Sequence, residues 1–162
     1  MNLAEWHDFF MATSGAAAAL TGLIFVGVSI NITKILSVPK LAERALLSLV
    51  LLLTILIISC LMLVPLQTGL IIGTEVSVIA VFIYAIVTKI DIGIYGKIPP
   101  DYRTKYLIGL IFNQLALLPY LVAGVVILCC GEKGIFWIVP GIVFSFIKGV
   151  IDAWVLLVEI NR

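Results

Sequence analysis

The stretch ALLSLVLLLTILIISCLMLV, residues 45–64, runs for a full transmembrane length without a single charged side chain. A helix needs about 20 predominantly apolar residues to cross the hydrocarbon core of a bilayer. The apolar run opens near Leu41 and is followed by Pro65. We therefore predict a transmembrane helix over about residues 41–64.

The composition of the whole chain agrees with a membrane protein. The 162 residues are 63% hydrophobic and 12% charged, whereas about a quarter of the residues of a soluble domain are charged. A chain this apolar cannot cover itself with a water-compatible surface, so we expect lipid to be its solvent. The net charge of +1 and the lack of a basic patch with interleaved aromatics argue against nucleic acid as a partner.

Four further apolar runs are long enough to cross the membrane, at about 9–32, 70–92, 102–129 and 136–160. Each should be a helix, because lipid offers no hydrogen-bond partner to a backbone that does not satisfy itself. The runs are apolar on every face and lack the alternation of a transmembrane barrel. We predict an all-α integral membrane bundle of five transmembrane helices, forming one domain over residues 1–162.

The basic residues predict the orientation, since cytoplasmic loops carry an excess of Lys and Arg. With five spans, those that share one side are Lys34, Lys40, Arg44, Lys89, Lys97, Arg103, Lys105 and Arg162. The opposite side has Lys133 alone. We therefore expect the N-terminus outside and the C-terminus in the cytoplasm.

The last run, GIVFSFIKGVIDAWVLLVEI at 141–160, carries Lys148 and Asp152 near its middle. At about 100° per residue, these two and Glu159 fall within roughly 40° of one another. A stripe of small residues lies beside them, made of Gly141, Ser145, Gly149 and Ala153. Small residues at this spacing allow another helix to approach closely. This side of the helix should therefore face protein or water.

Three interpretations of Lys148 and Asp152 stay open. They can form a buried ion pair that fixes helix packing, or they can line a polar route for an ion or solute. In the third, Lys148 extends its head group toward the membrane surface. Intramembrane ionisable residues favour the functional interpretation, and a pair that neutralises itself weakens it.

Two other runs carry polar or small positions. In the fourth, Asn113 and the neighbouring Gln114 need hydrogen-bond partners, and a polar cavity shared with Lys148 and Asp152 is one way to provide them. The alternative is a helix kinked at Pro119 that satisfies both amides locally. In the first run, a packing seam is expected at Ser14, Ala18 and Gly22, with the stripe of the last helix as one candidate partner. The alternative is that this seam lines a pore, where its hydroxyls would be weak ligands for an ion.

No pattern in the sequence indicates catalysis or a cofactor. With His7 as the sole histidine, neither bis-His haem ligation nor an HExxH metal site is available. The three cysteines, Cys60, Cys129 and Cys130, lie in or at the end of apolar runs, where they suit packing better than a disulfide framework. We therefore expect neither an enzyme nor a metal or cofactor site.

Several motifs together resemble a known family. They are WHDFFMATSGAAAALTGLIFVGVSIN near the N-terminus, RALLSLVLLL, QLALLPYLVAGV and the AWVLLVEI ending. The chain resembles small bacterial multi-pass membrane proteins, some of which are labelled as modulators of a membrane-bound protease. The resemblance implies a bacterial cytoplasmic membrane and supplies no catalytic or binding residues.

The functional hypotheses follow from the polar positions. A bundle of this size has little interior, so polar stripes on several helices would be better buried by self-association, which predicts a homo-oligomer. We expect a channel-like or carrier-like protein for ions or small solutes, with a route lined by Lys148, Asp152, Asn113 and Gln114. The alternative is a non-catalytic subunit that binds and regulates another membrane protein.

Overall fold

The computed structural model describes residues 3–38, 41–96 and 103–160, and every long element among them is a helix. The helices are η1 (Leu3–Trp6), α1 (His7–Ile30), α2 (Ile32–Ser37), α3 (Leu41–Met62), α4 (Gly69–Tyr95), α5 (Arg103–Cys130), η3 (Gly131–Trp137) and α6 (Ile138–Ile160). Five of them are long and apolar enough to cross a membrane. The predicted all-α bundle of five such helices is confirmed.

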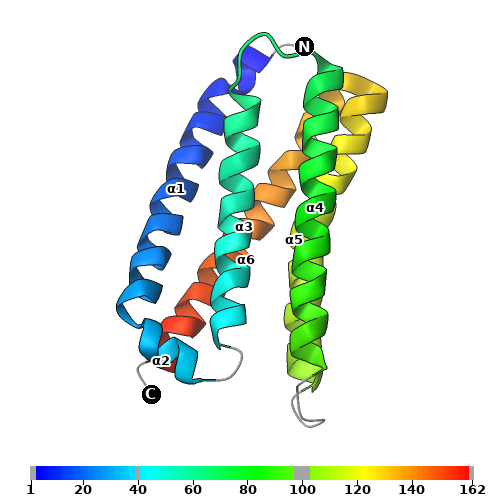
Figure 1. Cartoon of the computed structure of the whole chain (residues 1–162). Coiled ribbons are helices and arrows are strands. Elements are labelled where there is room, and N and C mark those ends of the chain that lie inside the picture. Colours follow the sequence, from blue (N-terminus) through cyan, green and yellow to red (C-terminus); the bar gives the residue numbers. More distant parts are fainter. Residues whose placement is uncertain (1–2, 39–40, 97–102, 161–162) are drawn as a thin grey trace.

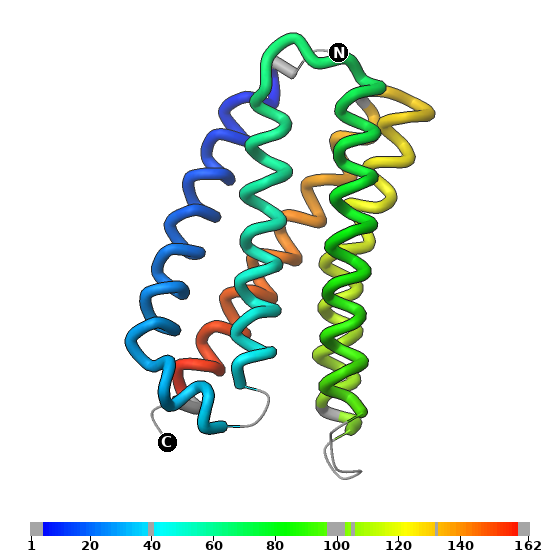
Figure 2. The backbone as a smooth tube through the Cα atoms, viewed as in Figure 1, coloured from blue at the N-terminus to red at the C-terminus, as the bar shows by residue number. Residues whose placement is uncertain are grey.

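The helices form two antiparallel pairs joined by a diagonal fifth helix. Figure 1 shows α1 beside α3 on one side of the bundle and α4 beside α5 on the other, and both pairs are in extensive contact. In Figure 2, α6 starts next to the end of α5 and finishes near α1 and α2. It packs on both α3 and α5, and α3 also contacts α4 directly, so α6 provides most of the contact between the two pairs.

The central helix of the bundle is α3, and α1 is peripheral. Of the residues in the apolar stretch of α3, 56% are buried within the chain, against 11% of those in α1. The buried side chains of α3 include Leu51, Leu52, Ile55 and Ile58. Helices that are apolar all round cannot show by their own pattern which of them is central, because lipid accepts the same side chains as a protein core.

The ends of two helices differ from the sequence-based bounds for local reasons. The first predicted helix, 9–32, ends at Ile30 as α1, and the short α2 follows it. At this break the Asn31 side chain donates to the Gly27 carbonyl at 2.9 Å. This bond satisfies one of the carbonyl groups that lack a backbone N–H donor at the end of a helix. Before α6, residues 131–137 form the 3-10 turn η3, with Gly131 at a positive φ of 64°.

Apart from Lys148 within α6 and Lys133, the described basic residues cluster at one end of the bundle. Lys34, Arg44, Lys89 and Arg103 lie in or near helix ends at the end where α2 lies, and Lys133 lies in η3 at the other. Lys40, Lys97 and Arg162 fall outside the described residues, as do the side chains of Lys105 and Glu159. The end that holds α2 and the end of α6 is called the basic end below.

The opposite end is closed by aromatic and aliphatic side chains. The Trp6 ring meets the Phe136 ring edge-on, with centroids 4.9 Å apart, and also packs with Phe9 and Phe10. Ile135 and Ile138 are fully buried beneath them. This contact joins the start of α1 to η3 at the end away from the basic residues.

Candidate functional site

The small-residue stripe of α6 lies against α3 and α5. A Cβ added at Gly141 would come 2.8 Å from the Tyr120 ring, and one at Gly149 would come 3.1 Å from Leu52. Ser145 is fully buried and accepts a hydrogen bond from the Tyr120 hydroxyl at 3.4 Å. Ala153 is also buried. The stripe therefore lets α6 cross closely between the two helix pairs of its own chain.

Lys148 and Asp152 form an ion pair on the same side of α6. They are one helical turn apart, and their side chains are 13% and 18% exposed, respectively. The pair lines a pocket of about 100 Å³ between α3, α5 and α6. Such a volume has room for several water molecules, since roughly 10–15 Å³ admits one. The pair is therefore turned to the interior of the chain and to a space large enough to be wet.

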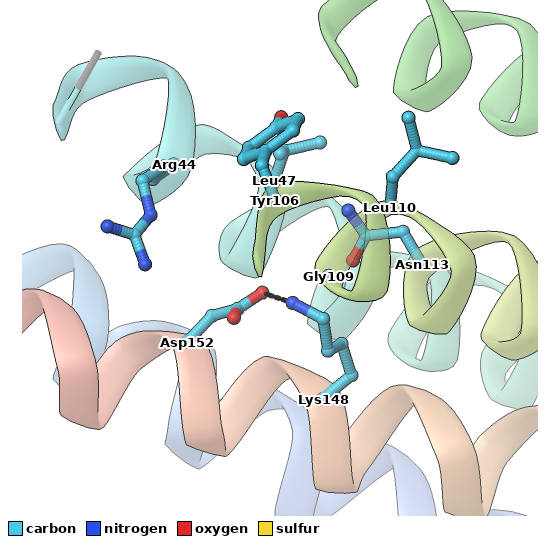
Figure 3. A pocket seen from close by; sticks show the side chains of 8 residues that line it. All are labelled: Arg44, Leu47, Tyr106, Gly109, Leu110, Asn113, Lys148 and Asp152. Carbon is cyan, nitrogen blue, oxygen red and sulfur yellow. Dashed lines mark hydrogen bonds and ion pairs between the residues drawn. The ribbon is translucent and has the colours of Figure 1, made fainter. Parts of the chain in front are cut away.

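The pocket is polar on three sides, as Figure 3 shows. Its lining comes from α3, α5 and α6, and consists of Arg44, Leu47, Tyr106, Gly109, Leu110, Asn113, Lys148 and Asp152. Arg44 is three residues into α3 and Tyr106 three residues into α5. The pocket thus lies in the half of the bundle nearer the basic end, where both helices begin.

Asp91 of α4 is the residue that the sequence analysis missed. Its relative exposure is 0%, although it is ionisable and lies within a candidate membrane span. One carboxylate oxygen accepts from the Tyr106 hydroxyl at 3.2 Å, and the Asn113 amide nitrogen donates to both oxygens, at 3.0 and 3.2 Å. A signal was present, because an acid inside an apolar run is a functional candidate by default.

Asn113 connects this buried acid to the pocket. Its side-chain nitrogen is used by Asp91, and its side-chain oxygen is buried with no hydrogen-bond partner among the described residues. In Figure 3 this oxygen is turned toward the side of the pocket that holds Lys148. A buried carbonyl without a partner costs free energy of about 1–3 kcal/mol. Asn113 therefore places a buried acceptor without a described partner at the wall of the pocket.

Gln114 does not belong to this pocket. Its side-chain nitrogen donates to the Thr88 hydroxyl at 3.2 Å, and the hydroxyl in turn lies 3.4 Å from the amide oxygen, at the α4–α5 interface. Neighbouring residues of a helix point about 100° apart. Asn113 lines the pocket beside Lys148 and also bonds Asp91 of α4, whereas Gln114 bonds Thr88, three residues earlier on α4, and does not line the pocket. The expectation that Gln114 lines a route with Lys148 is therefore wrong for the single chain.

Ser14, Ala18 and Gly22 of α1 do not pack on the stripe of α6 either, although Gly27 farther along α1 lies near Ala153 and Leu157. Ala18 and Gly22 are exposed on the single chain, and nothing approaches the position of a Cβ at Gly22 within 4 Å. Ser14 is partly buried and donates to the Met11 carbonyl of its own helix. Instead α1 packs on α3, through buried Phe10 and Ala17 and through a 2.9 Å hydrogen bond between Thr13 and Ser59. The expected contact between the two stripes is corrected accordingly.

This arrangement weakens one reason for expecting self-association. The polar side of α6 is already covered by α3 and α5 of the same chain, so it needs no second copy. The exposed small residues of α1 remain as a surface that lipid or another chain must cover. Among the described residues, no three His, Cys, Asp or Glu side chains come together to hold a metal ion.

Comparison of the chain with known protein families, curated proteins and solved structures finds no match. The site combines an ion pair, a buried acid and an unsatisfied amide oxygen around one small pocket inside a set of membrane-capable helices. Such an arrangement can hold a small polar or ionic species.

Proposed function

We propose that this multi-pass membrane protein is a carrier for ions or small solutes and that the pocket between α3, α5 and α6 is its binding site. The single observation that carries the proposal is the Asn113 side-chain oxygen, buried and without a described partner at the wall of a charged pocket. A purely structural ion pair needs no such space beside it. A solute that donates a hydrogen bond to Asn113, and meets Lys148 and Asp152 with its own charges, would complete the site.

A carrier fits better than an open channel. The pocket is near the basic end, and above it α5 and α6 meet through Tyr120 and Gly141 with no room for an added methyl group. Farther on, the core consists of Ile127, Ile138 and Ile142, all buried. A polar solute could enter from the basic end and would then need a rearrangement of α6 against α5 to leave at the other, which is alternating access.

For the setting of the protein, we propose a bacterial cytoplasmic membrane with the N-terminus outside. The helix ends that carry Lys34, Arg44, Lys89 and Arg103 gather at one end of the bundle, which supports this orientation because basic residues are retained on the cytoplasmic side. The pocket would then be open toward the cytoplasm. The resemblance to small bacterial membrane proteins supports the same setting.

Access to water distinguishes this proposal from a structural role, and a cysteine at position 109 tests it. Gly109 lines the pocket and has free space at its Cβ position. In a background without Cys60, Cys129 and Cys130, Gly109→Cys should react with a membrane-impermeant thiol reagent added at the basic end. Modification can be measured by mass spectrometry of intact membranes.

The matched control is Gly22→Cys, because Gly22 also has free space but lies on the outer face of α1. Lipid or a second chain should protect it from the same reagent. If Gly109→Cys stays as unreactive as Gly22→Cys in folded protein, the pocket is closed to water and the carrier proposal fails.

Uptake into liposomes tests transport directly. Labelled Na⁺, chloride and a small zwitterionic amino acid serve as probes of the three charge types. We expect at least one to enter faster than into protein-free liposomes, and Asp152→Asn to reduce that flux about tenfold or more, the equivalent of about 1.4 kcal/mol. Ser29→Ala, on the exposed face of α1, should transport as the unaltered protein does. Equal leak from all samples contradicts the proposal.

The second candidate is a non-catalytic subunit that binds another membrane protein, or a homo-oligomer that uses the same surface. The observation that favours it is the exposed small-residue face of α1 around Ala18 and Gly22. Such faces allow close helix contact in lipid. An unreactive cysteine at position 109, together with loss of a copurifying chain on Gly22→Leu, would favour this candidate over the carrier.

A further inference from the structure

We infer that Asp91 is a proton-binding site of the carrier and that the Tyr106 hydroxyl connects it to the pocket. The inference rests on the proposed function, since it names the ion that would accompany the solute. It starts from a carboxyl group that is fully buried inside a membrane-spanning segment. Such groups are rare in membrane proteins, and in pumps and transporters they mark proton relays.

The immediate partners of Asp91 are neutral, and one of them, the Tyr106 hydroxyl, can donate to the carboxylate or accept from the protonated carboxyl. Its hydrogen bonds come from neutral groups of α5, the Tyr106 hydroxyl and the Asn113 amide, and the neutral Gln114 amide of α5 also acts on it. The ammonium of Lys148 on α6 is near enough to act on Asp91 electrostatically, while its ion pair is with Asp152. On the pocket side, the charges of Arg44 of α3 and Asp152 of α6 act electrostatically on the Tyr106 hydroxyl. A buried carboxyl held by neutral donors avoids the cost of an unpaired charge when it binds a proton.

A proton suits this site better than a metal ion. Metal ions such as Na⁺ or Ca²⁺ need several oxygen lone pairs aimed at one point. Here Asn113 turns its NH₂ group toward Asp91 and its oxygen away, so donors already occupy the carboxylate oxygens. Lys148 and Arg44 also line the pocket and would repel a metal cation. A proton requires no such set of ligands.

Tyr106 provides the path because it belongs to both places. It bonds Asp91 and lines the pocket, and a hydroxyl group can donate and accept at the same time. In the release step, protonated Asp91 donates its proton to the Tyr106 oxygen as the Tyr106 hydroxyl proton passes to a pocket water. Asp91 becomes a carboxylate, Tyr106 stays neutral and the water becomes hydronium, so charge and atoms balance. Uptake is the reverse.

Release of the proton would alter the binding pocket through Lys148. The ionised Asp91 then competes with Asp152 for the same ammonium group. Because Lys148 has one charge to share between two carboxylates, loss of the proton weakens its pairing with Asp152 and changes the charge that a bound solute meets. This competition is the physical link between proton binding and solute binding.

The protonation state of Asp91 can be measured without any transport. Infrared difference spectra of purified protein in lipid nanodiscs, recorded from mildly acidic to mildly alkaline buffers, should show a carboxylic acid C=O band. We expect Asp91→Asn to remove this band, Asp91→Glu to move it, and Asp152→Asn to leave it in place. In deuterated buffer, Tyr106→Phe should slow its exchange about tenfold, the equivalent of about 1.4 kcal/mol at the barrier.

Each outcome has a definite meaning. A band that survives Asp91→Asn, or spectra with only carboxylate at position 91 over the whole buffer range, overturns the proton site. Exchange as fast in Tyr106→Phe as in the unaltered protein overturns the relay. If Asp91→Asn does not fold, Asp91→Glu still tests the assignment, because it keeps a carboxyl group and should shift the band. Since the spectra need no gradient, a proton site without solute uptake in liposomes would refute the carrier and leave the proton site standing.

Discussion

Lys148→Met is expected to lower the free energy of unfolding by about 3 kcal/mol. Removing one partner of a buried ion pair leaves an uncompensated charge, which costs roughly 3–5 kcal/mol. The lower part of that range applies, because the Asp152 side chain keeps 18% exposure, lines a pocket with room for water and has Arg44 on the same pocket. The measurement is unfolding of the purified protein in mixed micelles by increasing SDS.

A double variant separates the ion pair from simple loss of packing. Lys148→Met with Asp152→Leu removes both charges, and replacing a buried pair by apolar residues is often neutral or stabilising. We therefore expect the double variant to regain most of the stability that Lys148→Met loses. If the double variant is no more stable than Lys148→Met, the lost stability does not come from the ion pair. It then comes from the packing of the lysine side-chain stem.

Gly124→Val is expected to separate α4 from α5, with a loss of about 3 kcal/mol or more. A Cβ at Gly124 would fall against the Ser77 hydroxyl and 2.9 Å from the Ser77 Cα and backbone nitrogen. The backbone of α4 cannot move away as a flexible side chain could, and overpacking of this kind costs roughly 1–3 kcal/mol and at times more. The same SDS titration measures the effect.

Gly93→Val is the matched control, because it makes the same substitution on α4 where nothing lies within 4 Å of the added Cβ. It should unfold within about 0.5 kcal/mol of the unaltered protein, as is usual for a substitution that touches nothing. Equal stability of the two variants would mean that α4 and α5 do not approach as closely as the structure has them. Loss of this contact would also break the bonds from Tyr106 and Asn113 to Asp91, since these residues lie on opposite helices.

The candidate site divides into a part that the sequence indicates and a part that it hides. Lys148 and Asp152 stand out because charge is costly inside an apolar run, and their spacing places them on one side of a helix. Asp91 is charged too, but it lies four residues from the end of α4, where an acid can also sit at the membrane surface. Its burial depends on α5 covering that turn. No pattern within residues 70–92 contains that information.

Asn113 and Gln114 show the same limit for two adjacent residues. Both are polar amides in an apolar helix, and both were expected in one cavity. The structure directs Asn113 to Asp91 and the pocket, and Gln114 to Thr88. Which amide meets which partner depends on the rotation of α5 about its own axis against α4 and α6, and an apolar helix carries little information about that rotation.

The number of membrane-capable helices, their approximate bounds and the absence of strands from the described residues all follow from the order of the amino acids. The reason is that insertion into lipid is decided segment by segment, by length, apolarity and the need of each backbone to satisfy its own hydrogen bonds. Tertiary structure alone decided that α3 is central, that α6 crosses between two helix pairs, and that Ala18 and Gly22 face outward. Lipid is as apolar as a protein core, so contacts between helices depend on shape and on a few polar groups rather than on hydrophobicity. Those contacts become visible only when the helices are placed side by side.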